Sequence, residues 1–258
     1  MATENPGYTL RELMVAAAAR EIRDGEVIFV GMRLPLLAFF LAMGTRAGRA
    51  VGIYELGIVR DSAALDPVLT MGDLPNLYRA QWLADTGDVM GILQQGLVDA
   101  SFIGGAQIDR FGNLNTSYTK GPRGDITRLP GSGGACDLAT LGKRHIIIMA
   151  HEKHRFVPAV DYITSPGYGT GGDWRTRNGL AGGGPSAVIT TLGIMNFHEV
   201  DREMVLTSLH PGVTVDQVRE NTGWPLRAAE NINVTEPPGE KELEIIRRLD
   251  PKGFWSGA

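Results

Sequence analysis

Apolar residues recur along this chain with two spacings, and segments of each kind alternate. Residues 9–23 are apolar at helical intervals, with Thr9 as a candidate N-cap and Glu12 three residues later. Residues 34–43 are apolar on all sides, which predicts a buried helix. Further helices are expected at 88–96, 138–142, 214–221 and 241–249, and strands at 26–31, 50–59, 98–103, 113–118, 145–150, 186–191 and 203–208.

This alternation predicts an α/β fold with an open, mostly parallel sheet flanked by helices. Ligands of such sheets bind at the carboxyl ends of the strands. No segment has the composition of a linker, so residues 1–258 are expected to form a single domain. The Pro- and Glu-rich tail from residue 232 onward should be peripheral.

Composition and charge narrow the classes of protein. With 43% hydrophobic and 21% charged residues, the chain can bury a large core. The net charge of −4 argues against a nucleic-acid partner. No apolar run reaches about 18 residues, so no membrane span is expected. The first residues lack the features of a signal peptide, and Cys136 is the only cysteine; we therefore expect a cytoplasmic protein without an intrachain disulfide.

One carboxylate interrupts an apolar run. Glu55 lies within residues 50–59, which otherwise have the pattern of a strand. Ionised carboxylates are rarely buried without a partner, so Glu55 is either a solvent-facing residue of a sheet edge or a carboxylate kept for chemistry. Tyr54, as a desolvating aromatic wall, and Gly57, which lets a substrate approach, favour the chemical role.

Glycine-rich turns give further candidate sites. The chain has 34 glycines. Gly104, Gly105, Ala106 and Gln107 follow an expected strand, where small residues can present backbone N–H groups to an anion or an oxyanion. The alternative is a tight structural connection, which the polar residues that follow make less attractive. A weaker candidate is the turn that contains Gly133 and Gly134, before a short helix.

The segment 151–155 contains two histidines, but it does not have the spacing of a zinc site. His151 and His154 are three residues apart and follow a strand rather than lying on one helix face. A solvated basic turn is the preferred interpretation, and no metal site is expected. Such a turn could meet a phosphate of coenzyme A or a partner chain.

Taken together, these segments resemble the class I CoA-transferases, in particular the B (β) subunits of glutaconate CoA-transferase. The similarity runs from about residue 8 to residue 251. The segments that carry it are Phe102–Asn115, Gly131–Ala135, His151–Lys153 with Arg155–Phe156, Asp161–Tyr162 with Thr164–Gly167, and Asn221–Gly223.

The resemblance implies an open α/β sheet of the NagB/RpiA-like type and an active site shared with an A (α) subunit in a hetero-oligomer. It implies that Glu55, in Glu55-Leu56-Gly57, is the nucleophile, which carries CoA as a covalent thioester. Gly104 to Gln107 would line the CoA thioester, and Gly133 and Gly134 would have a less defined part. Coenzyme A would be a substrate, beside an acyl group and a carboxylic acid, with no permanently bound cofactor.

Two departures from the family pattern leave the reaction open. Leu56 replaces the small polar residue that follows the family's glutamate, and the segment 61–73 has no clear counterpart. Glu55 could instead be the general base of a CoA-thioester hydrolase, a decarboxylase or a carbon–carbon-cleaving enzyme on the same scaffold. The chain could also be a non-catalytic subunit that completes a partner's site.

Overall fold

The computed structural model describes residues 7–64, 66–121, 123–180 and 182–257. The segment 1–6, in which no signal peptide is expected, lies outside the described residues. The chain divides into two compact units, Met1–Phe102 with Glu236–Ala258, and Ile103–Thr235. The single domain expected from the sequence stays a prediction beside this division. None of the helices in the described part of the chain is both long and apolar enough to cross a membrane.

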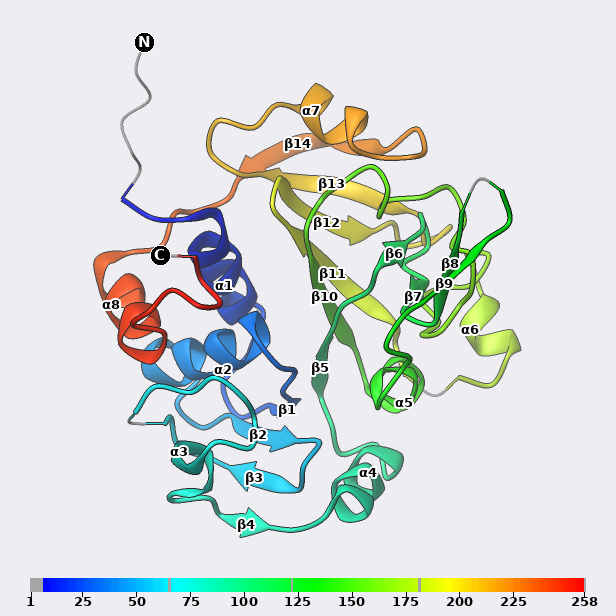
Figure 1. Cartoon of the computed structure of the whole chain (residues 1–258). Helices are drawn as coiled ribbons and strands as arrows, with labels where there is room; N and C mark the ends of the chain where they lie inside the picture. Colours follow the sequence, from blue (N-terminus) through cyan, green and yellow to red (C-terminus); the bar gives the residue numbers. More distant parts are fainter. Residues whose placement is uncertain (1–6, 65, 122, 181, 258) are drawn as a thin grey trace. The chain divides into compact units, whose positions relative to one another are not determined.

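The first unit contains strands and helices in alternation, as the hydrophobic pattern predicts (Figure 1). Its elements are α1 (Leu10–Arg20), β1 (Val27–Phe29), α2 (Leu34–Thr45), β2 (Val51–Tyr54), β3 (Ile58–Arg60), α3 (Leu74–Leu77), β4 (Trp82–Leu83), α4 (Thr86–Gln94), β5 (Ala100–Ile103) and α8 (Glu240–Leu249).

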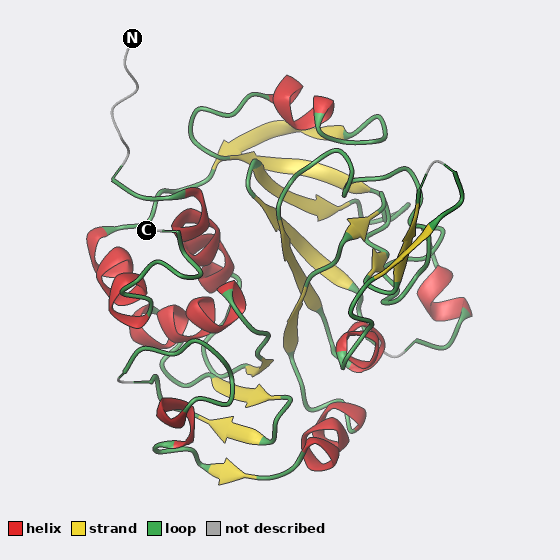
Figure 2. Ribbon diagram, in the orientation of Figure 1, coloured by secondary structure: helices red, strands yellow, loops and turns green. Residues whose placement is uncertain are grey.

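The strands of the first unit are ordered β5-β1-β2-β3-β4. The pairs β5–β1 and β1–β2 are parallel, whereas β3 and β4 continue the sheet antiparallel to their neighbours. Helices α1, α2 and α8 pack together beside these strands (Figure 2). Helix α2 comes so close to β2 that a Cβ on Gly52 would lie 2.5 Å from the ring of Phe39.

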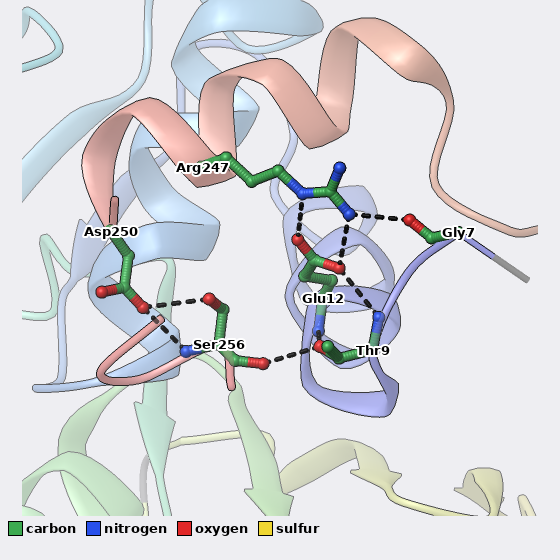
Figure 3. A network of polar contacts seen from close by, with 6 residues as sticks. All are labelled: Gly7, Thr9, Glu12, Arg247, Asp250 and Ser256. Atoms are coloured by element: carbon green, nitrogen blue, oxygen red, sulfur yellow. Dashed lines mark hydrogen bonds and ion pairs between the residues drawn. The ribbon is translucent and has the colours of Figure 1, made fainter. Parts of the chain in front are cut away.

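Helix α1 begins with the predicted capping box. Thr9 Oγ1 accepts the N–H of Glu12 at 3.1 Å, and the Glu12 carboxylate accepts the N–H of Thr9 at 2.8 Å. Figure 3 shows that this cap also binds the C-terminal segment: Arg247 of α8 donates to Glu12, and Thr9 Oγ1 donates to the carbonyl of Ser256 at 2.6 Å. Ser256 is in turn bonded to the Asp250 carboxylate. The two ends of the first unit are therefore joined by polar contacts.

In its described part, the second unit contains short strands, three helices and a larger sheet. Its elements are β6 (Gln107–Ile108), β7 (Leu114–Asn115), β8 (Tyr118–Lys120), β9 (Ile126–Arg128), α5 (Ala135–Leu141), β10 (His145–Met149), α6 (Trp174–Arg177), β11 (Pro185–Thr190), β12 (Gly193–Phe197), β13 (Met204–Leu209), α7 (Val215–Glu220) and β14 (Arg227–Val234).

The sheet of the second unit has the order β14-β13-β12-β11-β10. Its pairs β10–β11 and β13–β14 are parallel, and β11–β12 and β12–β13 are antiparallel. The buried guanidinium of Arg175 in α6 joins the surrounding loops, because it donates to the carbonyls of Ala139, Gly167 and Gly182 at 2.9 Å each. The predicted class, an α/β fold with an open sheet flanked by helices, is confirmed.

Several element boundaries differ from the prediction. The single strand expected at 50–59 is two strands, β2 and β3, separated by a tight turn. Helix α4 begins earlier than expected, with Asp85 rather than Asp88 as its cap. Strand β14 was not expected, because its alternating polar residues, most of them half-buried or exposed, resemble a loop. The last segment contributes to the core of the first unit, where Ile246 and Leu249 are buried.

Candidate functional site

Glu55 lies in the turn between β2 and β3, directly after the carboxyl end of β2. Tyr54 pairs with Ile58, and the carbonyl of Tyr54 accepts the N–H of Gly57 at 2.9 Å. Three residues therefore connect the strands, a loop length whose last residue favours glycine in the left-handed region. Gly57 has that conformation, with φ +97°. The turn holds Glu55 as a half-buried residue outside the strand ladder.

Gly57 is required sterically as well as conformationally. A Cβ on this residue would lie 2.2 Å from the carbonyl oxygen of Ala84, which follows β4. The N–H of Ala84 donates to the carbonyl of Gly57 at 2.7 Å. The hairpin that presents Glu55 is thus fixed from its far side by the edge strand β4.

Tyr54 is not the aromatic wall that the sequence suggested. Its side chain is fully buried, and its ring meets the ring of Phe39 edge to face, with centroids 6.4 Å apart. Burial raises the pKa of the Tyr54 hydroxyl, which finds no hydrogen-bond partner among the described residues. Tyr54 therefore anchors the turn in the core, and apolar contact at the Glu55 side comes from other residues.

The segment after β1 lies beside the Glu55 turn. The N–H of Val30 donates to the carbonyl of Ile53 at 2.9 Å, and the parallel register of β1 and β2, continued by two residues, places Gly31 opposite Glu55. Two residues further on, Arg33 caps α2 with φ +70° and ψ −126°. This is a costly backbone conformation for a residue other than glycine, and such residues are frequent at functional sites.

The side chain of Arg33 is exposed, and its guanidinium carbon lies 5.2 Å from the ring centre of Trp255. Trp255 Nε1 donates to the carbonyl of Leu69 at 3.0 Å. The backbone N–H of Trp255 binds the Asp250 carboxylate at 2.8 Å. The ring beneath Arg33 is thus held by bonds from two directions.

The segment 61–78, which has no clear counterpart in the family pattern, is anchored by a buried arginine. Arg60, 1% exposed, donates from Nε to the carbonyl of Ser62 at 2.6 Å, and from Nη1 to the carbonyls of Pro75 and Asn76 at 3.0 Å. Its guanidinium carbon lies 5.4 Å from the ring centre of Phe40. The segment is therefore a bonded part of the first unit.

This segment also reaches the residue after Glu55. The Asp73 carboxylate accepts the N–H groups of Leu69 and Thr70, at 2.6 and 2.9 Å, which closes a compact loop. Leu56 Cδ1 would lie 3.2 Å from a Cβ on Gly72 of that loop. Glu55 is therefore surrounded by a set of residues that we call the Glu55 rim: Met32, Arg33, Leu56, Leu69 and Trp255.

The first glycine-rich segment belongs to the second unit. The N–H of Ala106 donates to the carbonyl of Asn115 at 2.9 Å, so it is already used within the fold. Gln107 is buried: its Nε2 donates to the Asp161 carboxylate at 2.9 Å, and its Oε1 accepts Asn115 Nδ2 at 2.7 Å. Gln107 thus holds neighbouring loops together, which leaves Gly104 and Gly105 as the N–H donors to test.

The second glycine-rich turn is built differently from a side-chain cap. Gly134 is the N-cap of α5 and is buried, whereas Gly133 is exposed with φ +49°. The N–H of Ala135 returns to the carbonyl of Ser132 at 3.0 Å. With only seven helical residues behind it, the turn stays a weak candidate for anion binding.

The interpretation of 151–155 as a solvated turn is wrong for its first residue. His151 is 4% exposed, and its ring stacks on Phe156 with centroids 3.8 Å apart. Its two ring nitrogens lie 3.2 and 3.0 Å from the hydroxyls of Thr190 and Thr222. Burial lowers the pKa of His151 to about 4, so the ring is neutral and structural. Those threonines are distant in sequence, which is why the pattern gave no signal.

Comparison with known proteins identifies the class to which this site belongs. The family model for coenzyme A transferase matches residues 11–221. The chain is 43% identical to the B (β) subunit of 3-oxoadipate CoA-transferase from Pseudomonas knackmussii, over 95% of this chain and 94% of the relative. It is 35% identical to the B (β) subunit of glutaconate CoA-transferase from Acidaminococcus fermentans, over 95% and 93%. This chain therefore belongs to the coenzyme A transferase family.

The fold agrees with that assignment. The crystal structure of glutaconate coenzyme A-transferase from Acidaminococcus fermentans matches with a TM-score of 0.88 and 33% identity, over 96% of this chain and 97% of that one. The resemblance inferred from the glycine-rich segments is confirmed. Both relatives are named as one kind of subunit within a larger enzyme.

Proposed function

We propose that this chain is the B (β) subunit of a heteromeric cytoplasmic CoA-transferase that works with an A (α) subunit. The enzyme would move CoA between a small acyl-CoA and a free carboxylic acid, with Glu55 as the nucleophile. The observation that carries the proposal is the position of Glu55, in a rigid turn at the carboxyl end of β2, in a chain of this family. Coenzyme A is a substrate in this scheme, and no permanent cofactor is needed.

The reaction would proceed through two kinds of covalent intermediate. The Glu55 carboxylate attacks the thioester carbonyl of the acyl-CoA, which forms an acyl–glutamyl anhydride and releases CoA thiolate. The thiolate then attacks the Glu55 carbonyl, which releases the first acid and leaves a Glu55–CoA thioester. The acceptor carboxylate attacks that thioester and forms a second anhydride, and the released thiolate takes the new acyl group and restores Glu55.

The turn suits this chemistry because a carboxylate is a weak nucleophile that needs fixed geometry and little water around it. Glu55 is half-buried and fixed by the Tyr54–Gly57 hydrogen bond. Each tetrahedral intermediate carries an oxyanion, and one placed N–H donor is worth roughly 3–4 kcal/mol on such a species. We propose Gly104 and Gly105 as donors, together with groups of the α subunit; Gly133 and Gly134 remain secondary candidates for a contact with CoA.

Mass spectrometry of the co-expressed complex tests the proposal directly. The complex is incubated with acetyl-, butyryl-, succinyl- and glutaryl-CoA, and the peptide that contains Glu55 is examined for a CoA adduct. Borohydride should inactivate the enzyme only after acyl-CoA has been added. The Glu55→Gln complex should assemble normally, form no adduct and lose transfer.

Other outcomes would assign other functions. Release of free CoA without an acceptor acid, and without an adduct, would make Glu55 the general base of a hydrolase; release of carbon dioxide would indicate a decarboxylase. Full activity of the Glu55→Gln complex would make this chain a structural subunit that completes its partner's site.

A further inference from the structure

An exposed cation stands in the Glu55 rim with no acidic partner among the described residues. Arg33 makes no ion pair within that part of the chain, and its only side-chain contact of this kind there is the ring of Trp255, 5.2 Å from the guanidinium carbon. The exposed arginines that structure alone explains are paired, as Arg49 is with Asp24. An arginine stacked on an aromatic ring keeps its planar set of N–H donors free for a carboxylate or phosphate.

The backbone of Arg33 indicates that this display is specified. Arg33 is one of the few non-glycine residues with positive φ in the described part of the chain, and such a conformation costs roughly 1–3 kcal/mol. It persists because Trp255 is fixed by its bonds to Leu69 and to Asp250. Without that support, the chain at Arg33 would relax.

The neighbours of Arg33 in the rim are apolar. Met32, Leu56 and Leu69 are 43%, 56% and 49% exposed, which is unusual for large hydrophobic side chains that lie beside a carboxylate. A group that extends from Glu55 across these residues would meet methylene-compatible surface first and a guanidinium afterwards. All of these residues belong to the first unit.

We propose that Arg33 binds the distal carboxylate of a dicarboxylic acyl group whose thioester carbon is attacked by Glu55. This inference rests on the proposed function and names its substrate class. The apolar rim residues would contact the methylene chain, and Trp255 would act as a positioning residue for the guanidinium. A second carboxylate is repelled by Glu55, so an acyl group of this class requires a cation at its far end.

The phosphates of CoA are the other anions that an arginine could bind. They lie at the opposite end of the pantetheine arm from the thioester, whereas Arg33 follows β1 at the same edge as the nucleophile. The two possibilities separate experimentally, because a phosphate contact is shared by all acyl-CoAs and a distal carboxylate contact is not.

The test compares two acyl-CoAs of equal chain length, glutaryl-CoA and pentanoyl-CoA, on the co-expressed complex. Wild type should prefer glutaryl-CoA in kcat/KM by about 10- to 100-fold, the worth of a charge-assisted hydrogen bond. Arg33→Met should abolish that preference and change the pentanoyl-CoA value by less than about 3-fold. Arg33→Lys should restore part of the preference, because it keeps the charge but not the bidentate geometry.

The matched control is Arg49→Met, which removes an exposed arginine just before β2, at the opposite end of that strand from Glu55. It should leave the preference unchanged. For the positioning role, Trp255→Leu should reduce the preference while Trp255→Phe, which retains a ring, should preserve most of it. An equal loss for both acyl-CoAs in Arg33→Met would assign the residue to CoA phosphates and overturn the proposal.

Binding to the Glu55→Gln complex separates this inference from the proposed function. Calorimetry should give a lower Kd for glutaryl-CoA than for pentanoyl-CoA, and Arg33→Met should make the two equal. Selective binding without a CoA adduct on wild-type Glu55 would reject the transferase mechanism and keep the Arg33 site. An adduct without selectivity would reject the Arg33 site and keep the mechanism.

Discussion

Glu12 and Arg247 form a two-bond ion pair between α1 and α8, with Nε to Oε1 at 2.8 Å and Nη2 to Oε2 at 3.2 Å (Figure 3). The Glu12 side chain is 0% exposed, whereas that of Arg247 is 47% exposed. The same carboxylate caps α1 through Thr9. Loss of the arginine would therefore leave a buried carboxylate without its cation.

Replacement of Arg247 by methionine should lower the Tm of the complex by roughly 3–8 °C, since the buried charge of Glu12 loses its partner. Differential scanning calorimetry measures the change. The control is Asp24→Asn, which affects a solvent-exposed pair with Arg49 and should shift the Tm by no more than about 2 °C. Equal shifts in the two variants would show that the joint between α1 and α8 has no special weight.

Gly57→Ala should destabilise the chain and abolish transfer. The added methyl would meet the Ala84 carbonyl at 2.2 Å, and φ +97° disfavours any other residue. Gly91→Ala is the matched control, because its Cβ meets nothing within 4 Å and alanine in a helix is favoured by about 1 kcal/mol. Urea denaturation should thus move in opposite directions for the two variants. A stable, active Gly57→Ala enzyme would contradict the hairpin geometry.

Arg60→Lys should loosen the segment 61–78 more than it loosens the rest of the first unit. Lysine cannot reach the carbonyls of Ser62, Pro75 and Asn76 together, and each buried carbonyl left without a donor costs about 1–3 kcal/mol. Hydrogen exchange should therefore accelerate in that segment. Arg79→Lys, at an exposed arginine directly after the same segment, serves as the control; uniform acceleration across the unit would count against a local anchor.

His145 should make folding stability depend on pH. It is fully buried, both ring nitrogens lack partners among the described residues, and burial lowers its pKa to about 3. The folded chain then binds fewer protons than the unfolded chain between about pH 6.5 and 3, so this contribution is present above 6.5 and is lost as the pH falls.

His145→Met should flatten that dependence by up to about 1.4 kcal/mol per pH unit, and at pH 8 it should cost little because no hydrogen bond is lost. Denaturation midpoints measured from pH 5 to 8 check both expectations. An unchanged slope would show that the imidazole is hydrated or paired in solution.

The features that the sequence predicted well are those that neighbouring residues encode. The capping box of Thr9 and Glu12 and the buried helix α2 follow from local spacing and appear as expected. The turn at Glu55 was missed because apolar residues continue on both sides of it and only Gly57 marks it. Strand β14 was missed because most of its residues are half-buried or exposed, so its pairing with β13 supplies what its hydrophobicity does not.

The candidate site divides in the same way. Glu55 and the glycines were accessible from residue type and resemblance, whereas the Glu55 rim was not. Arg33 and Trp255 are separated by more than two hundred positions, and neither belongs to a recognisable motif. The burial of His151 against Thr190 and Thr222 was hidden for the same reason. Contacts between distant segments are set by the fold and leave no local pattern.

The place of Glu55 outside the strand ladder has a consequence for how such enzymes diverge. A turn residue that contributes no ladder hydrogen bond can be exchanged without refolding the sheet around it, because Tyr54 and Gly57 hold the hairpin by themselves. The chemistry at this position is therefore free to drift while the architecture is inherited intact. One scaffold can acquire a new reaction by a single codon change at this position.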